Sequence, residues 1–208
     1  MGTIDKGVRV LAAVEEIGPC ALADLVTATG LSRATTHRLA VALETHGLLR
    51  RTVEGRFALG LRLVGLGRAA TDALPLAEAA ASALAALRDA TGESVQLYVR
   101  EGEHRVCIAS LESPHGLRTI VPVGATLPLD RGSAGRVLWG EPVAGWSESV
   151  EEREPGVASV SAPVLDDAGR VVAAVGVSGP VERTSRRPGE RYGEAVLDAA
   201  RVIEAALR

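Results

Sequence analysis

Residues 27–39 read Thr27-Ala28-Thr29-Gly30-Leu31-Ser32-Arg33-Ala34-Thr35-Thr36-His37-Arg38-Leu39, and they join the end of one predicted helix to the start of another. Gly30 suits the left-handed residue that ends a helix, and Ser32 is a favourable N-cap for a helix over 33–46. An amphipathic helix over 4–17 precedes them and stops at Gly18-Pro19. This order is typical of a helix-turn-helix, whose last helix enters the major groove of DNA.

A small hairpin is predicted directly after the third helix. Two short strand-like runs, 48–51 and 56–59, flank a turn at Val53-Glu54-Gly55. Arginine stands on both sides of that turn, which favours a DNA-binding wing over a simple packing module. We therefore expect residues 1–60 to form a winged helix-turn-helix domain.

The charge distribution agrees with DNA binding by this first part. The whole chain of 208 residues has a net charge of −3, but residues 1–70 carry +3 and the remainder carries −6. Such an asymmetry is expected when one module contacts phosphates.

A helical projection centred on Leu39 predicts the inward and outward faces of the third helix. It turns Leu43, Ala42 and Thr35 inward and leaves the N-terminal part of the opposite face exposed. The predicted DNA contacts, with one from the wing, are Ser32, Arg33, Ala34, Thr36, His37, Arg38 and Arg56. The alternative is a three-helix packing module with a solvated arginine face.

The second part of the chain has a different sequence pattern, with strand-like runs between a first and a last helix. A linker helix over 61–73 leads to a domain over 74–208, which begins with an Ala-rich helix and ends with an amphipathic helix over 190–207. Between them we expect strands over 94–100, 105–111 and 120–123, a short helix opening at 132–135, and a hairpin over 156–165 and 170–179. In the first strand Val95, Leu97 and Val99 point inward and their polar neighbours outward. The prediction is an α+β protein with a GAF- or PAS-like antiparallel effector-binding domain.

A small-ligand pocket is expected in this second domain. Gly132–Gly135 would expose backbone N–H groups at a helix start, where a carboxylate can bind. Ser133, Ser159 and Ser178 supply hydroxyls, while Leu127 and Val157 supply apolar walls. The alternative is that these glycines and serines serve only turns and strand pairing.

The residues from Thr27 to Leu39, and Gly55-Arg56-Phe57-Ala58-Leu59-Gly60 after them, resemble the core and wing of the IclR-type (isocitrate lyase regulator) family. In the second domain, residues 124–129, 132–136, 152–164 and 175–180 are similar to family motifs in the same order. The resemblance implies a transcriptional regulator, and it looks closest to actinobacterial regulators of amino-acid metabolism. It also implies effector contacts at Leu127, Ser133, Ala134, Ser149, Val157, Ser159, Gly176 and Ser178.

One departure from the family pattern concerns the segment from Trp139 to Pro155. Members have a longer helical stretch here. Either a flap over the pocket is absent from this protein, or the segment that forms it is missing from the 208 residues. Ser149 adjoins this region and stands where some members have a carboxylate.

Composition excludes several other classes. The sequence has no long apolar stretch for a membrane span and no secretory signal at its N-terminus, so we expect a cytoplasmic protein without membrane contact. Cys20 and Cys107 are too few for a disulfide framework, and Cys107 is expected to be a small buried residue. The four histidines show no zinc spacing, and neither a nucleophile elbow nor a nucleotide-binding fingerprint occurs. We expect no enzyme activity, metal or cofactor.

The sequence thus predicts an effector-controlled DNA-binding transcriptional regulator. Its pattern does not distinguish repression from activation, and we take a repressor as the working expectation. The expected partners are a pseudo-palindromic operator in double-stranded DNA, a small effector such as an amino acid or keto acid, and further copies of the chain in a homodimer or dimer of dimers. The helix near 61–70 is the expected connector. The alternatives are an enzyme that uses the second-domain pocket, or a protein–protein adaptor or sensor without direct DNA binding.

Overall fold

A computed structural model of the chain describes residues 2–72, 75–140 and 145–208. The chain divides into two compact units, Met1–Ala70 and Thr71–Arg208, and each is described by itself. The predicted boundary between a linker and the second domain, at residues 73 and 74, lies outside the described residues.

The first unit has three helices followed by a two-stranded sheet. The elements are α1 (Thr3–Ile17), α2 (Leu22–Thr29), α3 (Arg33–Thr45), β1 (Leu49–Arg51) and β2 (Phe57–Leu59), and α4 (Arg62–Asp72) continues past the division between the units. The antiparallel hairpin pairs Leu49 with Leu59. Val10, Leu25, Ala40, Leu49 and Phe57 are at most 1% exposed and form the core.

Local signals determine the turn between α2 and α3. Gly30 has φ of 64° and its N–H donates to Val26 O, so the predicted left-handed helix end is confirmed. Ser32 Oγ accepts a hydrogen bond from Thr35 N at 3.3 Å, which confirms it as the N-cap of α3.

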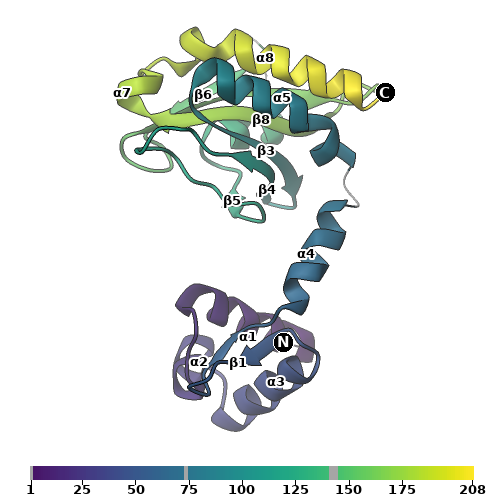
Figure 1. Cartoon of the computed structure of the whole chain (residues 1–208), viewed down its shortest axis with the longest axis vertical. Coiled ribbons are helices and arrows are strands. Elements are labelled where there is room, and N and C mark those ends of the chain that lie inside the picture. Colours follow the sequence, from purple (N-terminus) through teal and green to yellow (C-terminus); the bar gives the residue numbers. More distant parts are fainter. Residues whose placement is uncertain (1, 73–74, 141–144) are drawn as a thin grey trace. The chain divides into compact units, whose positions relative to one another are not determined.

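The second unit is built on a six-stranded antiparallel sheet (Figure 1). Its strands lie in the order β5-β4-β3-β8-β7-β6. The elements are α5 (Pro75–Thr91), β3 (Ser94–Glu101), β4 (His104–Leu111), β5 (Thr126–Pro128), α6 (Ser133–Trp139), β6 (Ser147–Val150), β7 (Val157–Leu165), β8 (Val171–Pro180), α7 (Val181–Thr184) and α8 (Pro188–Ala206). This arrangement confirms the predicted α+β class and the predicted hairpin near 156–179.

The two faces of this sheet are covered differently. Helices α5 and α8 pack on one face over a core that includes Leu84, Leu97, Val175 and Val196. Helix α6 packs on the other face, where Tyr98 and Cys107 belong to a smaller apolar cluster. The expectation that the polar residues of β3 point to solvent is therefore wrong for Ser94 and Gln96, which are at most 2% exposed, whereas Arg100 is exposed as expected.

The strand expected over 120–123 is also wrong. Pro122 has no N–H to donate to a neighbouring strand. The turn that follows bonds to β4 instead: Gly124 N donates to Cys107 O, and Cys107 N donates to Ala125 O. Regular pairing with β4 begins only at Thr126. Strand β6 and the short helix α7 carried no signal strong enough to be predicted.

Candidate nucleic-acid interface and ligand pocket

The N-terminal half of α3 presents a basic exposed face. Arg33, Ala34, His37 and Arg38 are all exposed, and so is the N-cap Ser32. Two guanidinium groups and an imidazole thus surround a small side chain that allows close approach. Such donors can bind phosphate oxygens or the acceptors on guanine in the major groove.

Thr36 does not belong to that face, contrary to the sequence-based expectation. Its side chain is fully buried, and its Oγ1 donates to Ser32 O at 3.1 Å. At about 100° per residue, Thr36 and Ala40 lie on the same side of Leu39 around the helix axis. The inward face is centred between Thr36 and Ala40 and not on Leu39. Ala42, expected inside, is exposed for the same reason.

The wing divides its arginines between two roles. The Arg51 guanidinium lies 3.8 Å from the centre of the Phe57 ring and donates to Gly55 O at 2.9 Å, so it stabilises the hairpin. Arg50 and Arg56 are exposed, and Arg56 also donates to Pro19 O at 3.3 Å. Arg56 is therefore held beside the turn of the wing and remains open to solvent.

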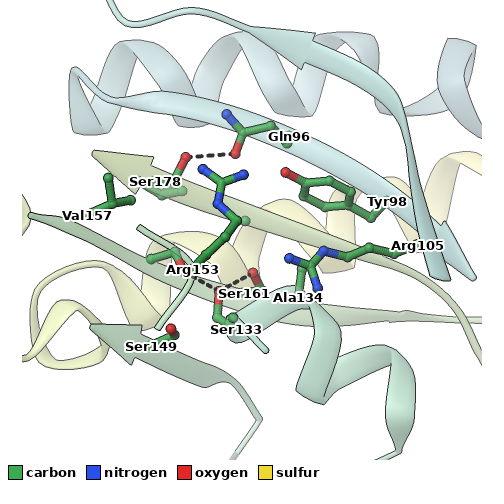
Figure 2. A pocket seen from close by; sticks show the side chains of 14 residues that line it. Gln96, Tyr98, Arg105, Ser133, Ala134, Ser149, Arg153, Val157, Ser161 and Ser178 are labelled. Atoms are coloured by element: carbon green, nitrogen blue, oxygen red, sulfur yellow. Dashed lines mark hydrogen bonds between the residues drawn. The ribbon is translucent and has the colours of Figure 1, made fainter. Parts of the chain in front are cut away.

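The second unit contains a polar cavity between α6 and the sheet (Figure 2). Its volume of about 40 Å³ is enough for about three water molecules, so it suits a small ligand. The lining residues are Gln96, Tyr98, Arg105, Gly132, Ser133, Ala134, Ser149, Arg153, Val157, Ser159, Ser161, Gly176, Val177 and Ser178.

Strand pairing explains why serines gather here. Ser159 of β7 is opposite Ser178 of β8, and Ser161 is opposite Gly176, so the two-residue period places all four toward α6. Ser133 Oγ is 2.8 Å from both Ser159 Oγ and Ser161 Oγ. A Cβ at Gly176 would lie 2.3 Å from Ser161 Oγ, so a glycine is required at that position.

Of the residues expected to contact an effector, all but one line this cavity: Ser133, Ala134, Ser149, Val157, Ser159, Gly176 and Ser178. Leu127 is the exception. It lies on β5 opposite Arg105 and packs against the apolar cluster around Cys107, outside the lining.

The expected carboxylate site at the start of α6 is partly occupied by the chain itself. Gly132 N donates to Glu152 Oε2 at 3.0 Å, and Arg136 forms an ion pair with the same carboxylate. This internal carboxylate takes the N–H group of Gly132, one of those expected to bind an effector, whereas Ser133 and Ala134 still line the cavity. A carboxylate site at the remaining N–H groups stays a prediction.

Sequence reasoning missed the strongest donors of the cavity, Gln96, Tyr98, Arg105 and Arg153. A signal existed for Arg105, because it shares a strand face with Cys107, which was expected to be buried. Arg105 is 3% exposed, and its Nη1 donates to Arg131 O at 2.8 Å and also to Pro128 O. No periodicity marks Arg153, which lies in a turn.

The electrostatics of the cavity are positive. Burial lowers the pKa of the Arg105 guanidinium, and the neighbouring charge of Arg153 lowers this pKa further. Burial raises the pKa of the Tyr98 phenol, so its O–H stays a neutral donor at physiological pH. Among the described residues that line the cavity, none is acidic. The site therefore favours an anion.

Two other findings concern the described residues alone. Within ranges 2–72, 75–140 and 145–208, no helix is long and apolar enough to cross a membrane. In the same ranges, no group of three or more His, Cys, Asp or Glu side chains is placed to hold a metal ion.

Family models match most of the chain. The IclR helix-turn-helix domain matches residues 3–52, and the C-terminal domain of the bacterial transcriptional regulator IclR matches residues 68–140 and 143–205. The break at 141 and 142 falls in the segment that the sequence marked as short, where residues 141–144 lie outside the described ones.

Curated relatives are transcriptional regulators. The glycerol operon regulatory protein of Streptomyces coelicolor is 29% identical over 220 residues, with 88% of this chain and 86% of the relative covered. The transcriptional repressor AllR of Escherichia coli is 26% identical over 243 residues, covering 98% and 89%. Both alignments exceed the 208 residues of this chain, so each relative has residues without a counterpart here. The names of these relatives do not support the finer placement among regulators of amino-acid metabolism.

Solved structures share the fold. An IclR homologue from Microbacterium hydrocarbonoxydans, complexed with 4-hydroxybenzoate, has a TM-score of 0.83 at 21% identity and covers 100% of this chain and 99% of its own. The IclR of Thermotoga maritima has a TM-score of 0.76 at 21% identity, covering 99% and 98%.

Proposed function

Because this chain belongs to the IclR family of bacterial transcriptional regulators, we propose that it binds a pseudo-palindromic operator through α3 and the β1–β2 wing. The observation that carries this proposal is the exposed basic face of Arg33, His37 and Arg38 at the start of α3. In a helix-turn-helix, this is the part of the recognition helix that reaches base edges. The family regulates transcription rather than catalysing a reaction, and nothing favours the adaptor alternative.

The proposed assembly is a homodimer or a dimer of dimers in the cytoplasm, acting as a repressor. Two copies of α3 would then contact two half-sites related by the symmetry of the protein. Residues 1–60 are the proposed DNA-binding domain, 61–73 the linker, and 74–208 the effector-binding domain. Helix α4, in which the division between the two compact units falls, is the proposed connector.

The cavity beside α6 is the proposed effector site. Hydroxyl groups of Ser133, Ser159 and Ser178 and a positive lining suit a small carboxylate, and one solved relative holds 4-hydroxybenzoate, itself a carboxylate. An effector that binds one arrangement of the protein more tightly would change operator affinity by a coupling energy of about 1–3 kcal/mol.

The test of DNA binding is selection of genomic fragments by the purified chain, with and without candidate metabolites. We expect a few fragments that share an inverted repeat, bound with an affinity that falls steeply as salt rises. Retention of no fragment above background, together with DNA-independent capture of a protein partner, would support the adaptor alternative instead.

The test of the effector site is Ser159→Trp, which places a large side chain in a cavity of about 40 Å³. Calorimetry with a metabolite that shifts operator affinity should then detect no binding, whereas operator binding without ligand persists. Unchanged ligand affinity in this variant would move the site elsewhere.

A further inference from the structure

The turn Glu151–Gly156, between β6 and β7, has one side chain in the cavity and its neighbours outside it. Glu151 adopts a positive φ of 59°, which is uncommon for a residue with a side chain. Its Oε1 accepts from Gly156 N at 3.1 Å and its Oε2 pairs with Arg186 at 3.0 Å. The Glu151 side chain is thus held through both of its carboxylate oxygens.

The second residue of the turn attaches it to α6. Glu152 accepts from Gly132 N and pairs with Arg136, as described above. The side chains of Glu151 and Glu152 are not part of the cavity lining, whereas the next side chain along the turn, that of Arg153, is. Figure 2 shows Arg153 with its guanidinium pointing into the cavity, among the other lining residues.

The positive charge of Arg153 is only weakly paired within the protein. Within the part of the chain that the structure describes, its one ion pair is with Glu154 at 3.7 Å, and the Glu154 side chain is 61% exposed, so the pair is weak. The second guanidinium of the cavity, that of Arg105, is held through Nη1 by two carbonyl oxygens, at Pro128 and Arg131, although its buried Nε has no partner among the described residues. In the described part of the chain the guanidinium of Arg153 has no such backbone anchor, so more of its donors remain for a ligand.

We infer that Arg153 selects the effector by its charge. A carboxylate of the ligand pairs with the Arg153 guanidinium, and the serines and Tyr98 receive the rest of a small polar molecule. A carboxylate fits the planar fork of arginine with two parallel hydrogen bonds, which no neutral group reproduces. This inference rests on the proposed function of the cavity as the effector site.

The same geometry predicts what the ligand charge does to the protein. The turn that carries Arg153 is joined through Glu152 to the first residues of α6, so pairing at residue 153 restrains the turn and the start of that helix together. Binding of the ligand charge and restraint of the turn are in this way coupled.

The test compares small acids with their neutral amides on the full chain. Acetate, pyruvate, lactate and malonate, with acetamide, pyruvamide, lactamide and malonamide, are titrated by calorimetry into the wild type, Arg153→Gln and Arg201→Gln. Arg201 forms an exposed pair with Asp198 on α8, and neither residue lines the cavity, so Arg201→Gln is the matched control. Thermal unfolding confirms that the variants are folded.

We expect at least one acid to bind the wild type while its amide does not. Loss of a charge-assisted pair should weaken binding of that acid about 10-fold or more in Arg153→Gln, and Arg201→Gln should bind it as the wild type does. Equal binding of acid and amide, an Arg153→Gln affinity within about threefold of wild type, or no binding by any acid would each overturn the inference. Failure of the proposed function has a different signature, namely acids that bind through Arg153 without changing operator affinity.

Discussion

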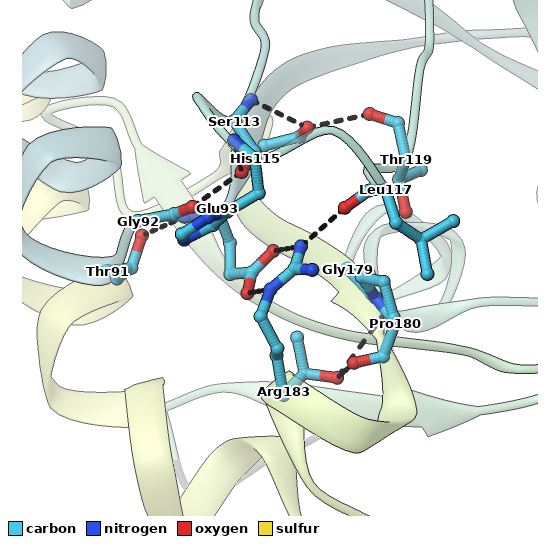
Figure 3. Close-up of polar contacts among 12 residues, drawn as sticks. Thr91, Gly92, Glu93, Ser113, His115, Leu117, Thr119, Gly179, Pro180 and Arg183 are labelled. Atoms are coloured by element: carbon cyan, nitrogen blue, oxygen red, sulfur yellow. Dashed lines mark hydrogen bonds and ion pairs between the residues drawn. The ribbon is translucent and has the colours of Figure 1, made fainter.

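Glu93 and Arg183, 90 residues apart in the chain, are joined by two hydrogen bonds of 2.6 and 2.8 Å (Figure 3). The carboxylate is 2% exposed, whereas the arginine side chain is 30% exposed. Arg183 Nη2 also donates to Leu117 O at 2.8 Å. This pair therefore fastens the start of β3, the helix α7 and the loop that contains Leu117 at one place.

Removing Arg183 should destabilise the second unit. In Arg183→Met the Glu93 carboxylate stays buried without its partner, which should cost about 2–3 kcal/mol of unfolding free energy. Urea unfolding followed by tryptophan fluorescence measures this unit selectively, because both tryptophans, Trp139 and Trp146, belong to it. The control is Arg201→Met, which breaks an exposed pair with Asp198 and should cost less than about 0.5 kcal/mol. Equal midpoints for the two variants would contradict the structural role of Arg183.

Arg38 should matter for operator binding far more than its neighbour Thr36. Arg38→Ala removes an exposed donor from the start of α3 and should weaken affinity about 5- to 100-fold, the range for a base or phosphate contact. Thr36→Val changes a fully buried side chain and should lower stability by about 1 kcal/mol while affinity stays within about threefold. Gel-shift titrations measure both, and the reverse order of effects would show that another face of α3 contacts DNA.

Arg56 and Arg51 of the wing should differ in how they affect the salt dependence of DNA binding. Arg56→Ala should reduce the slope of log affinity against log salt by about 1, because one phosphate contact is lost. Arg51→Ala should leave this slope nearly unchanged and lower the melting temperature, since the Arg51 guanidinium packs on Phe57. Fluorescence anisotropy over a series of KCl concentrations, with thermal unfolding beside it, tells the two roles apart. A larger change of this slope in Arg51→Ala than in Arg56→Ala would refute the two assigned roles.

Cys107 should make the second unit less stable in alkali. Burial raises the pKa of its thiol from the ordinary value of 9.0 to about 11. A raised folded-state pKa contributes stability that is complete below about pH 9 and is lost as the pH rises through about 11, by on the order of 2 kcal/mol. In Cys107→Ala this component should be missing, so the wild type and the variant should converge in that window. Parallel unfolding curves between pH 8 and 11 would contradict the assignment.

Local chemistry explains which elements were predictable. The helix end at Gly30, the cap at Ser32 and the hairpin around 53–55 depend on residues close in sequence, and each is where the pattern placed it. The two-residue period of β7 and β8 likewise brought Ser159, Gly176 and Ser178 to one face. Burial of both sheet faces is not local, and for that reason the polar residues of β3 were assigned to solvent.

The sequence by itself determined the helix-turn-helix, the antiparallel second domain and the serine-lined face, because caps, turns and periodicity act over a few residues. Only the tertiary structure decided that Thr36 is buried, that Glu152 occupies the N–H of Gly132 and that Arg153 enters the cavity. Each of these depends on which segment packs against which, through contacts between residues distant in the chain or through the exact rotation of a helix. Packing of that kind leaves no mark in a sequence pattern.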